Sequence, residues 1–395
     1  MHRAVILATC LACAGTAWAD NYLVLPFVNL TADKSLDWIG DSLGEAVRDA
    51  LASQGLPEID REDRTEAYQR LSIRPYALLT KASVVKIGEE LDAEQVIYGQ
   101  FTLKPGSGPS EKSRGSLQIT AHLLDLKHIT QGPEYSELGA LEDLAALQRH
   151  LAWQTLQFVI PATAPSETEF VRLHPAVRVD AIENYIRGLL APSFEEKHRF
   201  FTQAVRLDPG YSQPYFQLGK LYLQRKEYKL ASEWLLKMPP ADGPEREATF
   251  LLGLCRFYTG DYQGAQDAFQ AVAKVVPLNE VYNNLGAAES RRNLPEALDN
   301  LKKALEGDES DPAYHFNVGY SLWKKGQFEE AANRFREVLE RNPEDTDARL
   351  LLSRCEKQSG PRTGDTRTEA LERVKSNYEE SAWWQLKAAL QPPKK

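Results

Sequence analysis

The sequence predicts an α+β protein, in which an amino-terminal α/β module precedes an all-α superhelical solenoid of repeated helical hairpins that ends in a carboxy-terminal capping helix. Three observations predict it: strand and helix patterns mix over residues 20–160, glycines recur at a constant spacing after residue 181, and apolar residues follow a helical spacing near the end. The expected division is a leader at 1–19, the module at 20–160, a linker at 161–176, the solenoid at 177–360 and the cap with its tail at 361–395.

Residues 1–19 have the features of a secretory signal peptide. Arg3 supplies the positive start, a short apolar run follows, and Ala17 and Ala19 form a small-x-small cleavage site before Asp20. The apolar run is shorter than the roughly 20 residues that a membrane span needs. We therefore expect an exported, periplasmic mature chain without a transmembrane segment.

Four cysteines bear on this expectation. Cys10 and Cys13 lie in the apolar run, which leaves a lipoprotein open as an alternative to a soluble exported chain. Cys255 and Cys355 lie about three repeats apart, too far for the roughly 7 Å between Cα atoms that a disulfide allows. We expect these two thiols to be free and buried.

The charge balance excludes one class of partner. The chain has 47 basic and 56 acidic residues and a net charge of −9, and cleavage would remove one further positive charge. Affinity for nucleic acid depends on neutralising phosphates with lysine and arginine. An acidic chain of this kind therefore favours protein partners over nucleic acid.

The α/β module opens with a strand that Pro26 would confine to a sheet edge or a bulge. A helix follows, with Ser35 or Asp37 as the expected N-cap, and a later strand alternates strictly between apolar and polar residues. The expected strands are 21–29, 56–60, 93–103 and 115–126, the last two joined as a hairpin by 104–115, and the expected helices are 36–55, 62–72, 77–91 and 140–159.

The loop after the first strand does not hold a phosphate. "NLTADKSLDWIGDSLG" lacks both G-x-G-x-x-G and G-x-x-x-x-G-K-[ST], and Asp33, Asp37 and Asp41 would repel an anion. The stretches "VLPFVNLTADKSLDWIGDSLGEAVRDAL", "IGEELDAEQVIYGQF" and "LQITAHLLDL" instead resemble the amino-terminal α/β module of TolB, which also occurs in FlgO- and CsgG-type bacterial envelope proteins. The resemblance implies a non-catalytic periplasmic module that contacts other envelope proteins.

The solenoid follows from a glycine that recurs at a nearly constant interval. It stands at Gly219, Gly253, Gly286 and Gly319, and alanines follow on the second helix of each pair at the same offset, give or take one residue. This pattern resembles the tetratricopeptide repeat (TPR), a helix-turn-helix of about 34 residues whose stacked units form a superhelix. We expect five units and a sixth helix at 346–358. Leu371, Val374, Tyr378, Ala382 and Leu386 would then form one face of the capping helix.

In tetratricopeptide families the first helices line a concave groove that binds extended peptides or helices. By that resemblance, the residues expected to contact a protein or peptide partner of the cell envelope are Asn283, Asn284, Arg291, Tyr320, Trp323 and Arg354. No motif for a catalytic residue, a cofactor or a metal ion stands in the sequence. We therefore expect a non-catalytic scaffold.

The alternative is a ligand-binding or enzymatic α/β domain that the repeats target to its site of action. Its candidate polar groups are Asn29, Asp33, Asp41 and Tyr98, which would have to converge near the strand ends.

Overall fold

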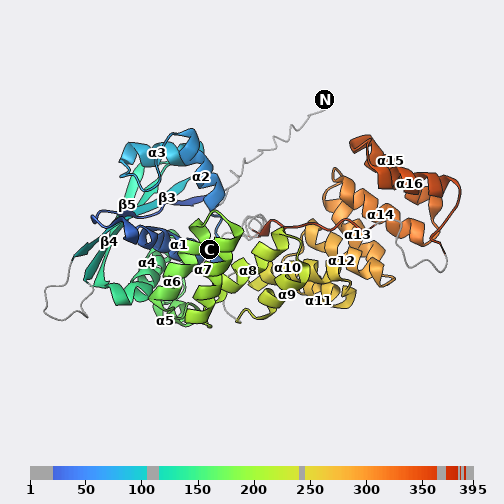
Figure 1. Ribbon diagram of the computed structural model, residues 1–395. Coiled ribbons are helices and arrows are strands. Elements are labelled where there is room, and N and C mark those ends of the chain that lie inside the picture. Colours follow the sequence, from blue (N-terminus) through green and yellow to red (C-terminus); the bar gives the residue numbers. More distant parts are fainter. Residues whose placement is uncertain are drawn as a thin grey trace, which may run out of the picture.

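The computed structural model describes residues 21–104, 115–239, 245–362, 371–380, 383 and 387. The expected signal peptide with Ala17, Ala19 and Asp20, the two cysteines Cys10 and Cys13 within it, and most of the link between the third and fourth strands lie outside these residues. A small sheet with helices forms one end of the molecule, and helical hairpins extend from it (Figure 1). The α+β fold class with a helical solenoid is confirmed.

Over the described residues, the strands form one sheet. They are β1 (Tyr22–Val24), β2 (Val28–Asn29), β3 (Gln95–Lys104), β4 (Ser116–Asp125) and β5 (Thr130–Ala140). The order is β1-β3-β4-β5, with β1 and β2 both parallel to β3, and with β4 antiparallel to its two neighbours. The expected strand at 56–60 is reduced to one bridge between Tyr22 and Glu58. β5 was not predicted, because glycine, proline and glutamates interrupt its apolar pattern.

Helices cover both faces of this sheet. Val24 and Ile97 pack on one face beneath α1 (Trp38–Ser53) and α4 (Leu144–Val159). Leu23 and Val96 pack on the other face with residues of α3 (Lys81–Glu90), and α2 (Arg61–Arg70) lies beside α3. Short 3₁₀ turns precede two of the helices, η1 (Lys34–Leu36) before α1 and η2 (Leu141–Asp143) before α4.

The first strand is broken at Pro26, at the edge of the sheet as predicted. β1 and β2 pair with β3 on either side of this break. The Phe27 N–H donates instead to the Gly40 carbonyl of α1 at 3.1 Å. A Cβ at Gly40 would lie 1.9 Å from the Phe27 oxygen, so glycine is required here. Asp37 occupies the N-cap position of α1 without a side-chain capping bond.

The stretch expected to be a linker is packed against the module. Residues Glu167–Leu173 form α5, and Phe170 in it is buried in the core beneath α4. One apolar cluster continues from Phe27 and Ile39 of the module to Ile182 and Phe201 of the first hairpin. The module and the start of the solenoid therefore share a core.

The solenoid consists, in the described residues, of five helical hairpins and one further helix. Its helices are α6 (Val179–Leu190), α7 (Phe194–Leu207), α8 (Ser212–Gln224), α9 (Tyr228–Leu236), α10 (Glu245–Thr259), α11 (Tyr262–Ala273), α12 (Asn279–Arg291), α13 (Ala297–Gly307), α14 (Pro312–Lys324), α15 (Phe328–Arg341) and α16 (Thr346–Glu356). A Cβ at Gly253 would lie 2.7 Å from the Phe269 ring, so the recurring glycine lets the two helices of a hairpin approach. Cys255 and Cys355 are free and buried, as expected.

The expected capping helix is wrong over residues 371–379, which form neither helix nor strand. Leu371 is half exposed, while Val374 and Tyr378 pack against the core around α10 rather than on the last hairpin. The apolar spacing suggested a helix, but polar side chains of the solenoid bond the main chain of this segment instead. Ala382 and Leu386 lie outside the described residues. Within the described ranges, no helix is long and apolar enough to cross a membrane.

Candidate functional site

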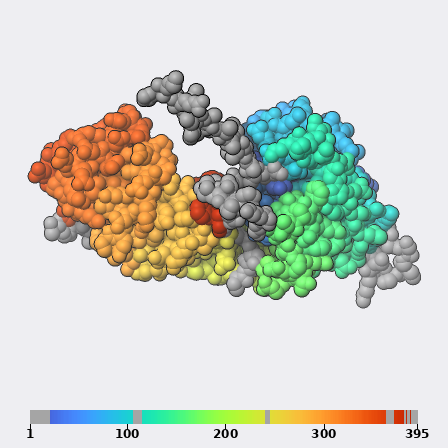
Figure 2. Space-filling view, turned by 180° about the vertical axis from the view of Figure 1, so that it is seen from behind, coloured from blue at the N-terminus to red at the C-terminus, as the bar shows by residue number. Residues whose placement is uncertain are grey.

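The expected groove is occupied by the chain's own carboxy-terminal segment, residues 371–380, hereafter the tail segment. It crosses the first helices of the later repeats and contacts residues of α10, α12 and α14 (Figure 1). In the space-filling view its red atoms lie set in the surface between the yellow and orange hairpins and the green ones (Figure 2). The groove is therefore seen with a peptide in place.

Two asparagines hold the main chain of the tail segment by paired hydrogen bonds. The Asn317 amide accepts from the Arg373 N–H at 2.7 Å and donates to the Arg373 carbonyl at 2.8 Å. The Asn284 amide accepts from the Lys375 N–H at 2.7 Å and donates to the Lys375 carbonyl at 2.9 Å. Asn283 donates a further bond to the Arg373 carbonyl at 2.7 Å. Alternate residues of the segment are thus bound alike.

The side chains of the same two tail residues meet aspartates at helix N-termini. Arg373 forms a bidentate pair with Asp345, the N-cap of α16, at 2.6 and 2.8 Å. Lys375 pairs with Asp311, the N-cap of α14. Burial tends to raise the pKa of Asp345, but the bonds from Arg373 outweigh it and the pKa lies below its ordinary value. Asp345 is therefore charged at neutral pH.

Aromatic rings lie under both cations. The Arg373 guanidinium stands 3.7 Å from the Phe316 ring centre, and the Lys375 ammonium stands 4.8 Å from that of Tyr314. Cations at such distances are attracted by the electron-rich faces of the rings. Each basic side chain thus has an aromatic ring and a carboxylate.

Acidic and apolar tail residues occupy other parts of the groove. Glu372 is fully buried, where it pairs with Arg291 and accepts from the Ser290 hydroxyl at 2.8 Å. Tyr378 packs 4.8 Å from the Phe250 ring of α10, between ring centres. Glu380 pairs with Arg246 of the same helix at 2.6 Å. The segment therefore runs from α14 back toward α10, opposite to the order of the repeats.

Five of the six predicted groove residues contact the chain that follows α16, and the sixth, Tyr320, packs beside one of them. Asn283, Asn284 and Arg291 bind the tail segment, as described above. The Trp323 indole donates to the Ser359 carbonyl at 2.8 Å, and Arg354 lies over the Trp323 ring and bonds the Ser359 hydroxyl. Tyr320 stacks on Trp323 at 5.5 Å.

These residues do not form an open surface. Tyr320 is 4% exposed and Trp323 is 1% exposed, and both belong to the core of the last repeats. Replacing such a ring by alanine costs about 3–5 kcal/mol. Substitutions at these two positions would therefore test the fold as much as partner binding.

We did not predict Asn317, Asp311, Asp345 or the position of the tail segment from the sequence. The signal was in the repeat: Asn284 and Asn317 each lie two positions before the recurring glycine, and Asp311 and Asp345 are one repeat apart. Equivalent positions of neighbouring repeats thus carry the same polar groups, which is the pattern of a surface that binds a regular chain.

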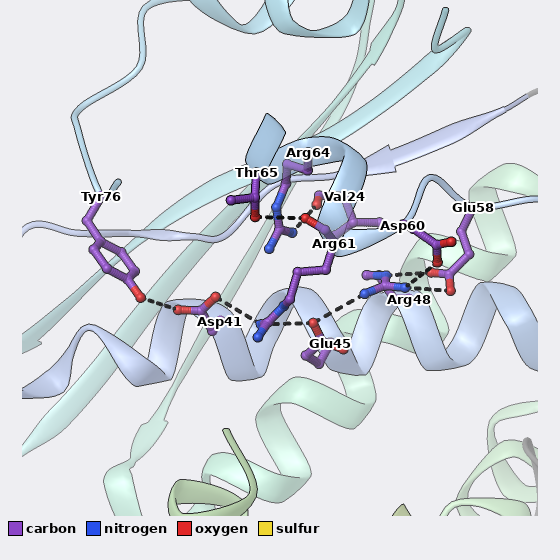
Figure 3. Close-up of polar contacts among 10 residues, drawn as sticks. All are labelled: Val24, Asp41, Glu45, Arg48, Glu58, Asp60, Arg61, Arg64, Thr65 and Tyr76. Atoms are coloured by element: carbon purple, nitrogen blue, oxygen red, sulfur yellow. Dashed lines mark hydrogen bonds and ion pairs between the residues drawn. The ribbon is translucent and has the colours of Figure 1, made fainter. Parts of the chain in front are cut away.

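A second polar cluster lies in the α/β module (Figure 3). Arg61 stands between Asp41, at 3.2 Å, and Glu45, at 3.1 Å. Arg48 pairs with Glu58 at 2.7 Å and with Glu45 at 3.4 Å. The Nε and Nη1 atoms of Arg61 are buried and have no hydrogen-bond partner among the described residues.

This cluster borders a cavity of about 820 Å³ between α1 and the first hairpins, lined on the other side by Tyr185 and Tyr211. Burial raises the pKa of Asp49 to about 8, with Glu45 and Glu58 adding to the effect and Arg48 opposing it. Burial likewise raises the pKa of Asp41. The cavity is thus lined by charges of both signs.

The four polar groups of the alternative do not converge. Asn29 donates to the Asp33 carbonyl and to the Asp37 carboxylate, both at 2.8 Å, and Asp41 binds Arg61 and Tyr76. Tyr98 packs instead on the His122 ring at 5.2 Å and joins the core under α3. Over the described ranges, no group of three or more histidine, cysteine, aspartate or glutamate side chains is placed to hold a metal ion.

Comparisons with known proteins identify the repeats. Residues 250–312, 287–332 and 316–360 match the family model of the tetratricopeptide repeat. Sperm-associated antigen 1 of Rattus norvegicus is 26% identical over 163 residues, which are 40% of this chain and 17% of that protein. The protein of the same name from Mus musculus is 26% identical over 162 residues, 39% of this chain and 17% of that one. The chain spans less than a fifth of either relative.

Three solved structures are similar to part of the chain. YrrB, a TPR protein with an unusual peptide-binding site, has 24% identity and a TM-score of 0.35 over 40% of this chain and 82% of its own. MamA has 22% identity and a TM-score of 0.38 over 42% and 92%. PilF of Pseudomonas aeruginosa has 18% identity and a TM-score of 0.38 over 45% and 83%. From the family match, the hairpins of residues 250–360 are tetratricopeptide repeats, which supports a protein–protein interaction scaffold.

Proposed function

We propose that this protein is an exported, periplasmic and non-catalytic scaffold. Its tetratricopeptide groove would bind an extended segment of another protein of the cell envelope, and its α/β module would dock to a second envelope component. The observation that carries the proposal is the bidentate grip of Asn284 and Asn317 on the main chain of the tail segment.

This grip suits binding of an extended peptide, because it satisfies both the N–H and the C=O of a residue whatever its side chain is. Asparagine is one of the few side chains that can do so, since its amide both donates and accepts. Neighbouring pockets for side chains then add specificity. Asn283, Asn284 and Asn317 are fully buried under the bound segment, where each bond is shielded from water.

The experiment for the groove replaces Asn317 by aspartate in the full chain. The carboxylate can still accept from a peptide N–H but cannot donate to its carbonyl. Asn333→Asp is the matched control, since Asn333 is exposed on α15. A photo-crosslinker on the exposed Leu350 of α16 would then capture neighbours in intact cells.

We expect one envelope protein to be crosslinked with equal intensity by the wild type and the control. The intensity of this crosslink should differ at least about tenfold in Asn317→Asp, because a hydrogen bond to a buried carbonyl is lost. Equal capture of that protein by all three chains would reject the groove as its binding site.

Export rests on the signal segment, which a mass measurement tests separately. The purified mature chain should begin at Asp20. A chain that keeps residues 1–19 would contradict export by this signal, and a lipid-modified cysteine at its amino terminus would support the lipoprotein alternative.

Docking through the α/β module rests on the resemblance to TolB-type modules and on one open edge. Within the described part, β5 pairs with β4 on one side only, and its Leu138 is 69% exposed. Such an edge can accept a strand from a partner. Leu138→Lys should weaken capture of the second component and leave capture by the groove unchanged; loss of both would contradict separate docking sites.

The cavity beside Arg61 favours a second candidate function, binding of a small polar ligand by the module. Two buried N–H groups of Arg61 without a partner among the described residues are the specific observation. Calorimetry of the full chain against nucleotides, glycans and divalent ions tests it, with Arg61→Lys as the comparison. Heat that Arg61→Lys abolishes would support this site, and no heat with any of them would reject it.

A further inference from the structure

The groove binds two basic positions of the tail segment with the same set of groups. At Lys375 an asparagine of α12 holds the main chain and the N-cap aspartate of α14 holds the side chain. At Arg373 an asparagine of α14 and the N-cap aspartate of α16 do the same. One step along the solenoid therefore corresponds to two residues of extended peptide.

Glu372 precedes Arg373, and Val374 lies between Arg373 and Lys375. These two residues contact the opposite side of the groove. Glu372 enters a basic pocket, where Arg291 pairs with it and Lys324 bonds the neighbouring Ser290. Val374 packs into the apolar cluster that contains Phe250 and Val281. One wall of the groove is thus acidic and contacts the basic residues of the segment. The opposite wall contacts Glu372 with basic groups and Val374 with apolar groups.

Further along, Tyr378 and Glu380 complete the match at α10, through Phe250 and Arg246. Along the segment, the groove contacts an acidic residue at 372, a basic residue at 373, an apolar residue at 374 and a basic residue at 375. It then contacts an aromatic residue at 378 and an acidic residue at 380. This pattern is read from the contacts of "ERVKSNYEE", residues 372–380.

We propose that the tail segment is a built-in competitor of the groove's external ligand, and that this ligand is an extended peptide of the same kind, acidic-basic-apolar-basic followed by an aromatic residue. The inference rests on the proposed function, because it assumes that the groove serves an external peptide. Binding of that peptide then requires release of residues 371–380 from the groove.

The magnitude of the competition follows from the tether. A segment joined to its own groove by a short chain has an effective concentration of about 1 mM. If the free peptide binds an open groove with a Kd of about 10 μM, the tail segment weakens its binding about a hundredfold.

The test measures binding of a fluorescent peptide with the sequence of residues 371–380 to three full-length mature chains. They are the wild type, Arg373→Glu with Lys375→Glu, and Lys229→Glu with Lys302→Glu as a control. The first pair places carboxylates against Asp345 and Asp311, while the control pair makes the same charge change at exposed positions of α9 and α13. A peptide of scrambled order tests the specificity.

We expect the tail variant to bind the peptide at least about tenfold more tightly than the wild type and the control, and to ignore the scrambled peptide. Equal binding by all three chains would overturn the competition and leave the proposed function intact. No binding by any chain, with the tail variant folded by circular dichroism, would overturn the proposed function as well.

Two further measurements cover the remaining outcomes. If the tail variant does not fold, excess labelled peptide on the wild type should raise hydrogen exchange at Arg373 and Lys375, and unchanged exchange would reject the competition. If light scattering shows that the wild type forms a dimer that the tail variant does not form, the segment belongs in the groove of a second copy. An intramolecular competitor would then be wrong.

Discussion

The groove and the polar cluster of the α/β module both hold charges away from water, but they do so differently. In the groove, Arg373 and Lys375 are matched to aspartates some 28 and 64 residues away in sequence. In the cluster, Asp41, Glu45 and Arg61 come from two neighbouring helices, and two N–H groups of Arg61 lack a partner among the described residues. A set of charges that all have partners is typical of a surface with its ligand in place. In the cluster, by contrast, Arg61 has N–H groups that can still donate hydrogen bonds.

The largest expected effect comes from replacing Asp345, the partner of Arg373 in the groove. Asp345→Ala removes the bidentate partner of Arg373 and the cap of α16, and should lower the free energy of unfolding by about 2–4 kcal/mol. Asp261→Ala is the control for capping, because Asp261 caps α11 through the Gly264 N–H and does not touch the tail segment; its own ion pair with Arg256 is longer, at 3.6 Å. Denaturant unfolding of both variants measures the difference; equal losses would show that Arg373 contributes nothing.

A smaller effect separates the two asparagines. Asn317→Asp loses the donor to the Arg373 carbonyl and to Asn283, whereas Asn284→Asp loses only the donor to the Lys375 carbonyl. Each missing bond to a buried carbonyl costs about 1–3 kcal/mol. We expect both variants to be destabilised, Asn317→Asp by more. The reverse order in thermal unfolding would contradict the described contacts.

The pH dependence of the groove should come from Asp345. Its pKa in the folded chain lies below the ordinary value of 3.8, so its contribution to stability is fully present above about pH 4 and is lost as the pH falls below that. The difference in stability between the wild type and Asp345→Asn should therefore shrink between pH 5 and pH 3. A difference that stays constant over this range would contradict an ionised pair with Arg373.

The cluster of the module should show the opposite sign. The pKa of Asp49 is raised to about 8, so the folded chain keeps this proton at pH values where the unfolded chain has lost it, and stability falls as the pH rises from about 4 to 8. Asp49→Asn removes this penalty. We expect the variant to gain at least about 1 kcal/mol over the wild type between pH 5 and pH 8. A gain that is equal at both pH values would contradict the raised pKa.

The repeated part of the fold could be predicted from the sequence, since each glycine must meet a large side chain of the second helix, as Gly253 meets Phe269. Such a contact imposes a period that the sequence displays. β5 could not be predicted in this way, because its residues are mostly exposed and pair with β4 through the main chain. Its polar composition therefore carries no alternation.

Some of the residues that line the candidate site could be predicted from the sequence, but the segment that occupies it could not. Asn283 and Asn284 were named from the resemblance to tetratricopeptide families, and both bind the main chain of the tail segment. The tail segment was expected to be a helix, because Leu371, Val374 and Tyr378 have helical spacing. Contacts between Arg373 and Asp345, or between Glu372 and Arg291, depend on where the chain returns after α16, and neither period nor composition specifies this.

The central claim is that residues 371–380 occupy the groove of their own chain, and hydrogen exchange of the full-length protein tests it most directly. The Arg373 and Lys375 amides donate to Asn317 and Asn284, so they should exchange at least about a hundredfold more slowly than in the free peptide of residues 371–380. Asn317→Asp should reduce this protection. Exchange of both amides at the rate of the free peptide would contradict the account.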